Sequence, residues 1–259
     1  VVIGDKLYLS PLIMNSDMGR PEGWQFKVRG VCIVEIPIID KRPEFSKSRQ
    51  IKADLYRREA DRQYVGGIAY MPYHPDMGYP HGDGYIYGYG YISSLVNENG
   101  RPQMIVGRVR PEEFTDTANW RFYNGRDFVP GIENGVSVLE HISCEMSVVP
   151  ITAGINKGKF LAVFQYDGKS PYVGYAIGET PWGPFAEANR VYECDEKKRV
   201  NETVYTYNAK AHSHLSTPDC ILASYNVNSP SMKENCRTAD IYHPRFIRLH
   251  DTTIQEGIL

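Results

Sequence analysis

Long apolar segments and an export-type leader are missing from this sequence. No run of 18 apolar residues occurs, so no membrane-spanning helix is expected. The first ten residues, VVIGDKLYLS, lack the basic start and long apolar centre of a signal peptide. Because these residues look like the interior of a strand, we expect an N-terminal segment upstream of Val1.

An excess of positive charge is also missing. The chain has 29 Lys and Arg against 31 Asp and Glu, and no Lys/Arg run forms a basic stripe. Nucleic-acid binding requires many cationic contacts to the phosphate backbone, so nucleic acid is not expected as a partner.

Cysteine pairs with metal-ligand spacing are absent. The five cysteines are odd in number and widely spread, and none forms a CxxC motif. This argues against a zinc knuckle and against a dense disulfide framework. Cys32, Cys144 and Cys220 lie in apolar, strand-like runs, so we predict that they are buried free thiols.

The sequence is instead rich in residues of short strands and turns, with 19 Tyr, 9 Phe, 23 Gly and 17 Pro. Strand-like segments come in clusters separated by Gly, Pro, Asn or Asp turns. The clearest cluster has four segments, at residues 66–73, 84–92, 103–110 and 120–130. Two further clusters repeat this order, at 143–151, 159–167, 172–179 and 190–196, and at 206–215, 220–228 and 245–251 with a weak tail.

Sequential strands that recur in this way predict an all-β fold of the propeller class, with 1–259 forming a single domain. The segments VVIGDKLYLSP, FKVRGVCIVEIP and QIKADLY correspond to the second, third and fourth strands of a blade whose first strand is absent. The count is roughly three and a half blades, which is too few to close a ring, so the N-terminal blade is expected to be incomplete in this chain. A β-sandwich is the main alternative.

Glu145 is the first candidate for chemistry, since the inner strand of a blade borders the ligand pocket of a propeller. In HISCEMSVVPI, alternation places Ser143, Glu145 and Ser147 on one face of a strand. A carboxylate in an apolar strand loses solvation, which raises its pKa and suits a general acid. The alternative is a structural carboxylate paired with an Arg between blades.

His212, Lys210 and His214 are predicted to share one face of the next inner strand. Burying three such groups without a ligand is unfavourable, which indicates substrate binding. Two histidines spaced in this way can also bind a metal, but no accompanying carboxylate identifies a metal site, so a structural histidine is an open alternative.

Further along the chain, Tyr242, His243 and Arg245 offer an aromatic ring and a guanidinium suited to a hydroxyl-rich or anionic ligand. Arg108 is a similar candidate, although a salt bridge between blades is the commoner role of such an Arg. Asp83 lies in an Asp-Gly turn before a strand, where turn formation is the first explanation.

Aromatic residues are concentrated between positions 70 and 91, where seven tyrosines suit either stacking on sugar rings or packing between blades. Trp182 lies in TPWGP, which we interpret as a rigid turn between a third and a fourth strand.

The segments from HISCEMSVVPI to YHPRFIRL resemble the bacterial domain-of-unknown-function families 4185 and 5005, which belong with five-bladed propeller glycoside hydrolases. The AKAH and SYNVN segments followed by PRF are the more specific part of this resemblance. It implies a five-bladed propeller that hydrolyses glycosidic bonds, with furanosides such as arabinan as a plausible class. It also implies that Glu145 is the general acid, that His212 lies near the axis at the substrate or a metal ion such as calcium, and that Arg245 faces the pocket.

The chain departs from this pattern at the second carboxylate that such enzymes need. The inner strand at 66–73 carries no Asp, and the nearest carboxylates are Asp76 and Asp83 in the following loop. Either Asp83 or a residue upstream supplies the second carboxylate, or the chain binds glycans without cleaving them.

The sequence therefore predicts a glycoside hydrolase, with a non-catalytic glycan-binding propeller as the alternative and a protein-interaction scaffold as a third class. The expected partner is carbohydrate, and we expect a monomer. The family resemblance implies a secreted or periplasmic location, and no nucleotide-binding motif points to another.

Overall fold

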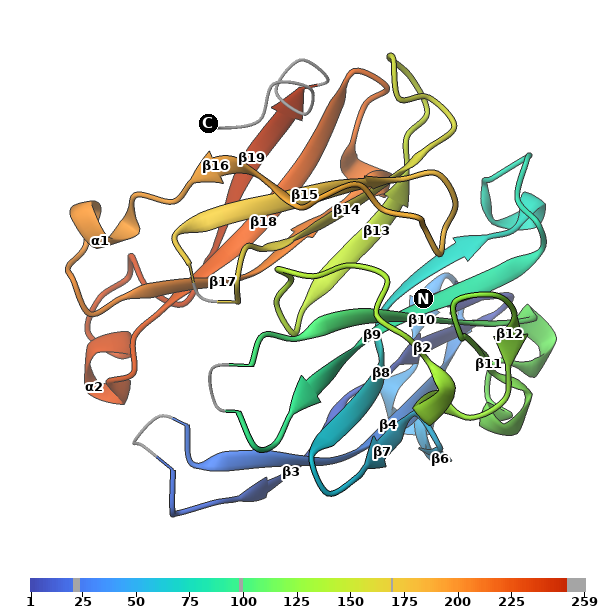
Figure 1. The fold of residues 1–259 in the computed structure, drawn as a ribbon, viewed down its shortest axis with the longest axis horizontal. Coiled ribbons are helices and arrows are strands. Elements are labelled where there is room, and N and C mark those ends of the chain that lie inside the picture. The colour runs from blue at the N-terminus through green and yellow to red at the C-terminus, as the bar shows by residue number, and fades with distance from the viewer. Residues whose placement is uncertain (21–23, 98–99, 169, 251–259) are drawn as a thin grey trace. The chain divides into compact units, whose positions relative to one another are not determined.

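The computed structural model describes residues 1–20, 24–97, 100–168 and 170–250. Its strands form four antiparallel sheets that follow one another along the chain, as Figure 1 shows. This confirms the all-β propeller class predicted from the sequence. Two compact units are distinguished, one made of residues 1–18, 26–98 and 105–136, the other of residues 19–25, 99–104 and 137–259.

The first sheet is built on a long central strand, β4. Its strands are β1 (Val2–Ile3), β2 (Lys6–Leu9), β3 (Leu12–Ser16), β4 (Phe26–Ile39), β5 (Arg42–Pro43) and β6 (Arg49–Ala53). Strands β2 and β3 pair with different parts of β4, and β6 also pairs with β4. The simple strand order expected here was wrong, because β4 is long enough to pair with several short strands.

The second sheet has the order β12-β11-β10-β9-β8-β7. Its strands are β7 (Tyr56–Arg58), β8 (Arg62–Tyr73), β9 (Tyr85–Ser94), β10 (Gln103–Val109), β11 (Arg121–Tyr123) and β12 (Phe128–Val129). The predicted segment 50–56 divides between β6 and β7, which belong to different sheets. The predicted strand 120–130 is a hairpin, since Asn124 accepts backbone N–H donors from Arg126 and Asp127 and Gly125 has a φ of 95°.

The third sheet contains β13 (Met146–Pro150), β14 (Phe160–Gln165), β15 (Tyr172–Gly178) and β16 (Asn189–Glu193) in chain order. The fourth contains β17 (Tyr205–Ala211), β18 (Cys220–Asn228) and β19 (Pro244–His250). These sheets confirm the predicted strand clusters, except that Asp251 and the weak tail lie outside the described residues. Trp182 lies between β15 and β16, as predicted.

Short helices connect the strands. The 3₁₀ helices are η1 (Phe45–Lys47), η2 (Pro75–Met77), η3 (Pro111–Glu113), η4 (Thr117–Asn119), η5 (Ile132–Asn134) and η6 (Ser213–Leu215), and the α-helices are α1 (Glu196–Arg199) and α2 (Met232–Asn235). Within the part of the chain that the structure describes, no helix has the length and hydropathy needed to cross a bilayer.

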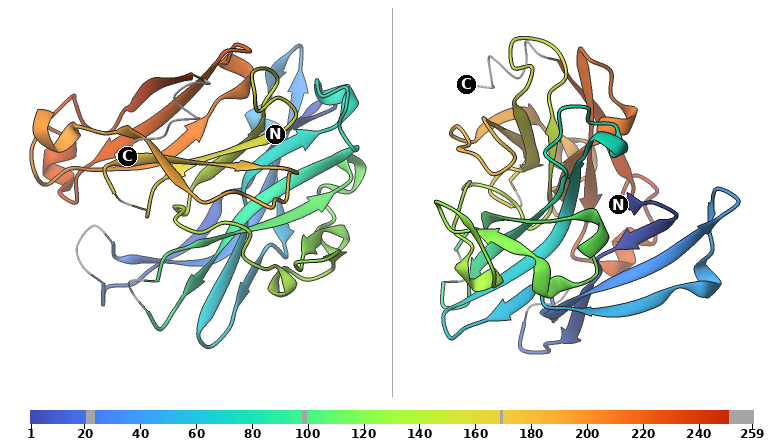
Figure 2. Two further views of the ribbon diagram at one scale, coloured as in Figure 1. Left: turned by 45° about the horizontal axis from the view of Figure 1, so that its top comes forward. Right: turned by 90° about the vertical axis from the view of Figure 1, so that its right-hand side faces the viewer.

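The third and fourth sheets share one hydrophobic core, and Figure 2 shows their yellow to red strands from two further sides. Strand β17 packs against β13 and β14, so apolar side chains of both sheets meet. The core includes Leu161, Val163, Tyr225 and Val227, which are fully or almost fully buried. Side chains at the start of β13 and along β17 therefore lie close together although they are far apart in the sequence.

The predicted buried cysteines divide into three cases. Cys32 is buried as predicted, and Cys220 is half-buried. Cys144 is exposed, because it lies in a bend before β13 rather than within that strand. All five cysteines are free thiols.

Candidate functional site

Glu145 and Lys210 form the centre of a half-buried polar group in the second unit. Burial raises the pKa of Glu145, and the positive charge of Lys210 partly opposes this effect. Burial likewise lowers the pKa of Lys210, and Glu145 partly opposes that change. The two side chains therefore influence each other across neighbouring sheets. Their sheets are joined where the Ala211 backbone N–H donates a 2.7 Å hydrogen bond to Ser147 Oγ.

The local structure around Glu145 differs from the prediction. Strand β13 begins at Met146, so Glu145 lies in the bend before it and the predicted alternating face is wrong. Ser143 is buried there and donates a hydrogen bond to the Glu145 carbonyl oxygen. Glu145 is thus held by its backbone at the entrance to a strand, with its side chain within electrostatic range of Lys210.

Two tyrosines of β17 are within electrostatic range of Glu145, and both are also influenced by Tyr242. Burial raises the pKa of Tyr205 to about 12, with further contributions from Tyr207, Tyr242 and Glu145. Burial also raises the pKa of Tyr207, helped by Tyr242 and Glu145. The Tyr205 ring packs against Tyr207 at 5.8 Å and against Trp24 at 5.6 Å between centroids. We call Glu145, Lys210, Tyr205, Tyr207 and Tyr242 the Glu145 cluster.

A bulge in β17 brings these tyrosines and Lys210 together. The register between β17 and β18 shifts between Tyr207 and Lys210, and Asn208 has a φ of 58°. The exposed Tyr242 also has a positive φ, of 67°, in the loop before β19. Loop and bulge geometry therefore determine the cluster, and strand alternation alone does not predict it.

His212 lies next to the Glu145 cluster but outside a strand. Strand β17 ends at Ala211, and His214 is in η6, so the predicted shared face with Lys210 is wrong. Burial lowers the pKa of His212, and the charges of His214 and Lys210 lower it further. Its Nε2 lies 2.7 Å from Ser224 Oγ. His212 is therefore a neutral hydrogen-bonding group near pH 7.

The histidine pair does not fit a calcium ion. Calcium takes six to eight oxygen ligands, whereas the neighbours of His212 here are the Ser224 hydroxyl and the rings of His214 and Phe246. Among the described residues, no group of three or more His, Cys, Asp or Glu side chains could hold a metal ion.

Arg245, predicted to bind substrate, is engaged with protein groups. Its Nε lies 3.3 Å from Oε1 of Glu196, a carboxylate with 1% exposure, and its Nη2 donates to the Asp240 carbonyl oxygen at 2.6 Å. The Tyr225 hydroxyl also lies 3.1 Å from both Glu196 oxygens. A buried carboxylate needs such partners, so the observed contacts of Arg245 are structural.

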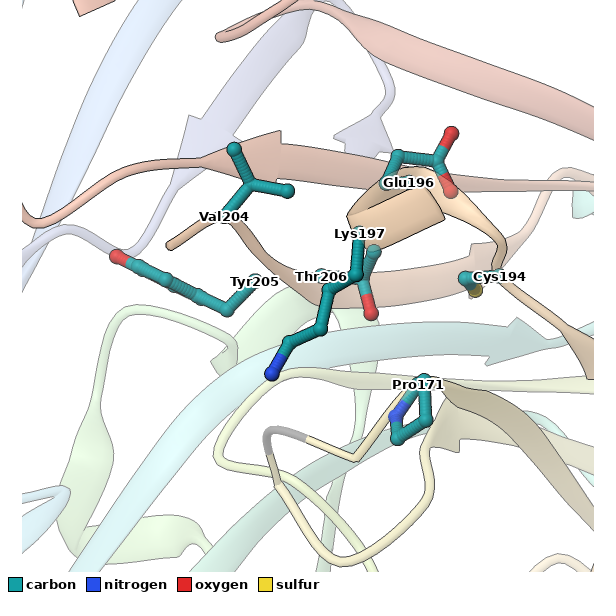
Figure 3. A pocket seen from close by; sticks show the side chains of 7 residues that line it. All are labelled: Pro171, Cys194, Glu196, Lys197, Val204, Tyr205 and Thr206. Atoms are coloured by element: carbon teal, nitrogen blue, oxygen red, sulfur yellow. The ribbon is translucent and has the colours of Figure 1, made fainter. Parts of the chain in front are cut away.

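Glu196 and Cys194 also line a small cavity, shown in Figure 3, of about 10 Å³, room for one water molecule. Its other lining residues are Pro171, Lys197, Val204, Tyr205 and Thr206. Burial raises the pKa of the Cys194 thiol to about 12. This cavity is too small for a sugar, and its thiol is not activated for nucleophilic chemistry.

Asp83 and Arg108 lie in the first unit. Asp83 accepts hydrogen bonds from the Tyr87 hydroxyl at 2.5 Å and from the Tyr85 backbone N–H at 3.2 Å. Arg108 stacks over Tyr85 and Phe128, with its guanidinium carbon 4.3 and 4.0 Å from the ring centroids. Asp83 thus stabilises the turn before β9, as its Asp-Gly sequence indicates, and its catalytic role stays a prediction.

The comparisons with known proteins identify the family. A family model described as Domain of unknown function (DUF5005) matches residues 2–252. The chain belongs to this family. This confirms the resemblance of the DUF5005 chain to family 5005, while the resemblance to family 4185 stays a prediction. No curated protein matches the DUF5005 chain in sequence.

Three solved structures are similar to the chain at low sequence identity, and the TM-score indicates a shared fold for the first of them. A protein titled a "putative hydrolase" from Bacteroides ovatus ATCC 8483 has a TM-score of 0.66 and 15% identity, covering 100% of the DUF5005 chain and 62% of the other. A thermostable family-43 glycoside hydrolase has a TM-score of 0.48 and 16% identity, covering 96% of the DUF5005 chain and 70% of the other. An ulvan lyase of family PL25 has a TM-score of 0.42 and 14% identity, covering 88% of the DUF5005 chain and 44% of the other. The DUF5005 chain thus spans about three fifths of the length of the first of these.

Sequence reasoning missed one polar group of the DUF5005 chain. His141 Nδ1 and Arg101 Nη1 both lie 2.8 Å from Asp167 Oδ1, and the His141 ring stacks on Tyr166 at 5.3 Å. His141 also lines an open pocket of about 450 Å³ with Glu140, Phe185 and Glu187 among its other lining residues. The positive φ values of His141 and Asp167 arise in loops that no strand pattern predicts.

Proposed function

We propose that this DUF5005 protein is a glycoside hydrolase in which Glu145 is the general acid. The observation that carries the proposal is the half-buried carboxyl group whose pKa is raised by burial, within electrostatic range of Lys210, Tyr205 and Tyr207. A carboxyl group with a raised pKa keeps its proton at a pH where an exposed Glu has lost it. It can then protonate the oxygen of the leaving group as the glycosidic bond breaks.

The neighbours of Glu145 suit a saccharide. The hydroxyl groups of Tyr205, Tyr207 and Tyr242 can donate and accept hydrogen bonds, and their rings supply apolar surface for a sugar ring. Lys210 provides a positive charge that stabilises the Glu145 carboxylate after it has given up its proton. We assign substrate binding to Lys210, to the tyrosines and to the nearby His212.

The finer features of the proposal follow the family resemblance. They are a five-bladed propeller, a furanoside such as arabinan as substrate, and a secreted or periplasmic location. The mechanism also needs a second carboxylate, for which Asp83 is the candidate from the sequence. Two carboxyl groups about 5 to 5.5 Å apart would give retention of configuration, and about 6.5 to 9.5 Å apart inversion.

The test is hydrolysis of a panel of neutral polysaccharides, including arabinan, by the wild-type protein and by Glu145→Gln. We expect release of reducing sugar to fall by about 100-fold or more in this variant, because a general acid contributes a factor of this size. Glu179→Gln is the matched control, since Glu179 is an exposed carboxylate of the same unit paired with Lys159. Release of sugar by Glu145→Gln at the wild-type rate would contradict the assignment.

A non-catalytic glycan-binding protein is the second candidate. It is favoured by one observation: the pKa of Glu145 responds to burial, to Lys210 and to its own backbone, with no contribution from another carboxylate among the described residues. Binding of a polysaccharide without release of sugar, by both the wild-type protein and Glu145→Gln, would support this candidate over the hydrolase.

A further inference from the structure

Three arginines converge on one pocket in the first unit, distant in sequence from the Glu145 cluster. The pocket has a volume of about 200 Å³, and Arg108, Arg110 and Arg121 line it together with Tyr85, Val109, Glu113, Asn119 and Phe128. Arg108 and Arg121 are directly opposite each other on β10 and β11. Arg110 follows Arg108 by two residues, which places it toward the same side as the chain leaves β10. We call these three residues the arginine triad.

The arginine triad lacks matching negative charge. Among the residues that the structure describes, no carboxylate lies within 4 Å of any of the three guanidinium groups, although Glu113 lines the same pocket. Asp83 contacts Arg110 only through its backbone carbonyl oxygen. Its carboxylate accepts a hydrogen bond from the Tyr87 hydroxyl, and this hydroxyl also interacts with Arg108. Like charges directly opposite each other on paired strands are destabilising. An arrangement of this kind is stabilised when an anion lies between the charges.

The guanidinium groups are held in place by the protein while most of their donors remain unused. Arg108 and Arg110 both lie over the Tyr85 ring, at 4.3 and 3.9 Å from its centroid. Arg110 Nη1 donates to the carbonyl oxygens of Asp83 and Gly84 at 3.3 and 3.2 Å.

The third guanidinium is anchored separately. Arg121 Nη1 donates to the carbonyl oxygens of Ala118 and Trp120 at 2.8 and 3.0 Å. Since a guanidinium has five N–H donors, Arg110 and Arg121 each keep donors that are positioned for a ligand. Arginine recognises planar or tetrahedral oxyanions through paired donors of this kind.

We propose that the arginine triad binds the carboxylate or sulfate group of an acidic saccharide. The saccharide part rests on the proposed function, whereas the recognition of an oxyanion rests on the triad alone. The pocket is smaller than the 300 to 1,000 Å³ typical of sites for larger ligands, so it holds a charged group and the adjoining part of one sugar ring. The site therefore selects acidic over neutral chains.

The first experiment is calorimetric titration of the whole protein with sodium sulfate, with sodium chloride at the same ionic strength as the reference. We expect saturable sulfate binding to the wild-type protein and a loss of at least about tenfold in affinity in Arg121→Gln. Arg110→Gln is expected to lose affinity for sulfate as well, although Arg110 is held by other backbone carbonyl groups than Arg121. Arg126→Gln is the matched control, because Arg126 lies in the adjacent hairpin turn with 91% of its side chain exposed. Sulfate binding no stronger than that of chloride, or unchanged in both triad variants, would overturn the proposal.

The second experiment distinguishes the source of the oxyanion. Oligogalacturonate is compared with its methyl ester, and a sulfated carrageenan oligosaccharide with its desulfated form. We expect the wild-type protein to prefer at least one charged form, and we expect the preference to disappear in Arg121→Gln. Equal affinity for charged and neutral forms in both pairs would overturn the saccharide assignment.

Glu145→Gln separates this proposal from the proposed function. It leaves the arginine triad unchanged, so it is expected to bind sulfate as the wild-type protein does. If no polysaccharide is hydrolysed but the triad-dependent preference for charged saccharides persists, the hydrolase proposal fails and the arginine site stands.

Discussion

Glu35 on β4 supports a quantitative prediction about stability. Its side chain is 7% exposed and accepts hydrogen bonds from Arg49 Nε at 2.6 Å, Lys6 Nζ at 3.1 Å and the Tyr8 hydroxyl at 3.0 Å. Tyr8 and Arg49 are directly opposite Glu35 on the two neighbouring strands. The carboxylate therefore joins β2, β4 and β6 at the centre of the first sheet.

The magnitude follows from the pKa of Glu35, which these partners, Arg49 first, lower from 4.5 to about 2. A lowering of this size corresponds to about 3 kcal/mol of stability. Arg49 is 63% exposed, so solvent screening weakens its share. We expect Glu35→Gln to reduce the free energy of unfolding by about 2 kcal/mol at pH 7.

The same pKa sets the pH dependence. A carboxyl group whose pKa is lower in the folded protein stabilises it above the unfolded value, and this contribution is lost as the pH falls from 4.5 through about 2. Urea unfolding at pH 7 and at pH 2 measures it, and the difference between wild type and Glu35→Gln should shrink at the lower pH. Glu59→Gln is the control, because Glu59 is 38% exposed and its ion pair with Arg62 is 3.9 Å long. Equal stability of wild type and Glu35→Gln at pH 7 would refute the reasoning.

Three further predictions concern the site and the packing. Lys210→Met removes the positive charge that lowers the pKa of Glu145. The decline of the hydrolysis rate at high pH should therefore move to higher pH in the pH–rate profile. A decline that is unchanged or moves to lower pH would count against the role of Lys210. Arg245→Met removes one cation from the buried Glu196, which keeps the Tyr225 hydroxyl at 3.1 Å and Arg199 at 3.7 Å, and should lower the free energy of unfolding by about 2 kcal/mol in urea. Loss of glycan binding with unchanged stability would restore the ligand role of Arg245. Gly90→Ala would place a Cβ 2.0 Å from a carbonyl oxygen of β8 and should lower the free energy of unfolding in urea by about 3 kcal/mol or more. Gly30→Ala is the control, because its Cβ would meet its nearest neighbour at an ordinary 3.5 Å.

Local patterns predicted the strands well where both ends of a segment are marked by turns. The segments at 159–167 and 172–179 correspond to β14 and β15, because their apolar residues are bounded by Gly, Asp and Pro. The first sheet was harder to predict, since one long strand pairs with several short ones. Which strands pair there depends on contacts between residues distant in the chain, which local propensity does not encode.

In the candidate site, too, some features follow from the local sequence and others from long-range contacts. The sequence by itself marked Glu145 and Lys210 as polar residues within predicted inner strands, and Tyr242 as an aromatic residue that could hold a ligand together with Arg245. Only the tertiary structure decided that Glu145 and Lys210 influence each other and that Tyr242 influences Tyr207, because the bulge in β17 and the loop before β19 set these positions.

Arg245 and the arginine triad show why the sequence determines the charge of a residue but not the partner of that charge. The sequence established that these residues carry fixed positive charges, and in every case left the partner of the charge open. Folding decided it: Glu196, 49 residues away, neutralises Arg245, whereas the register of β10 and β11 sets Arg108 opposite Arg121. A charge is determined by residue type alone, while its energy depends on burial and on neighbours that only the packed chain supplies.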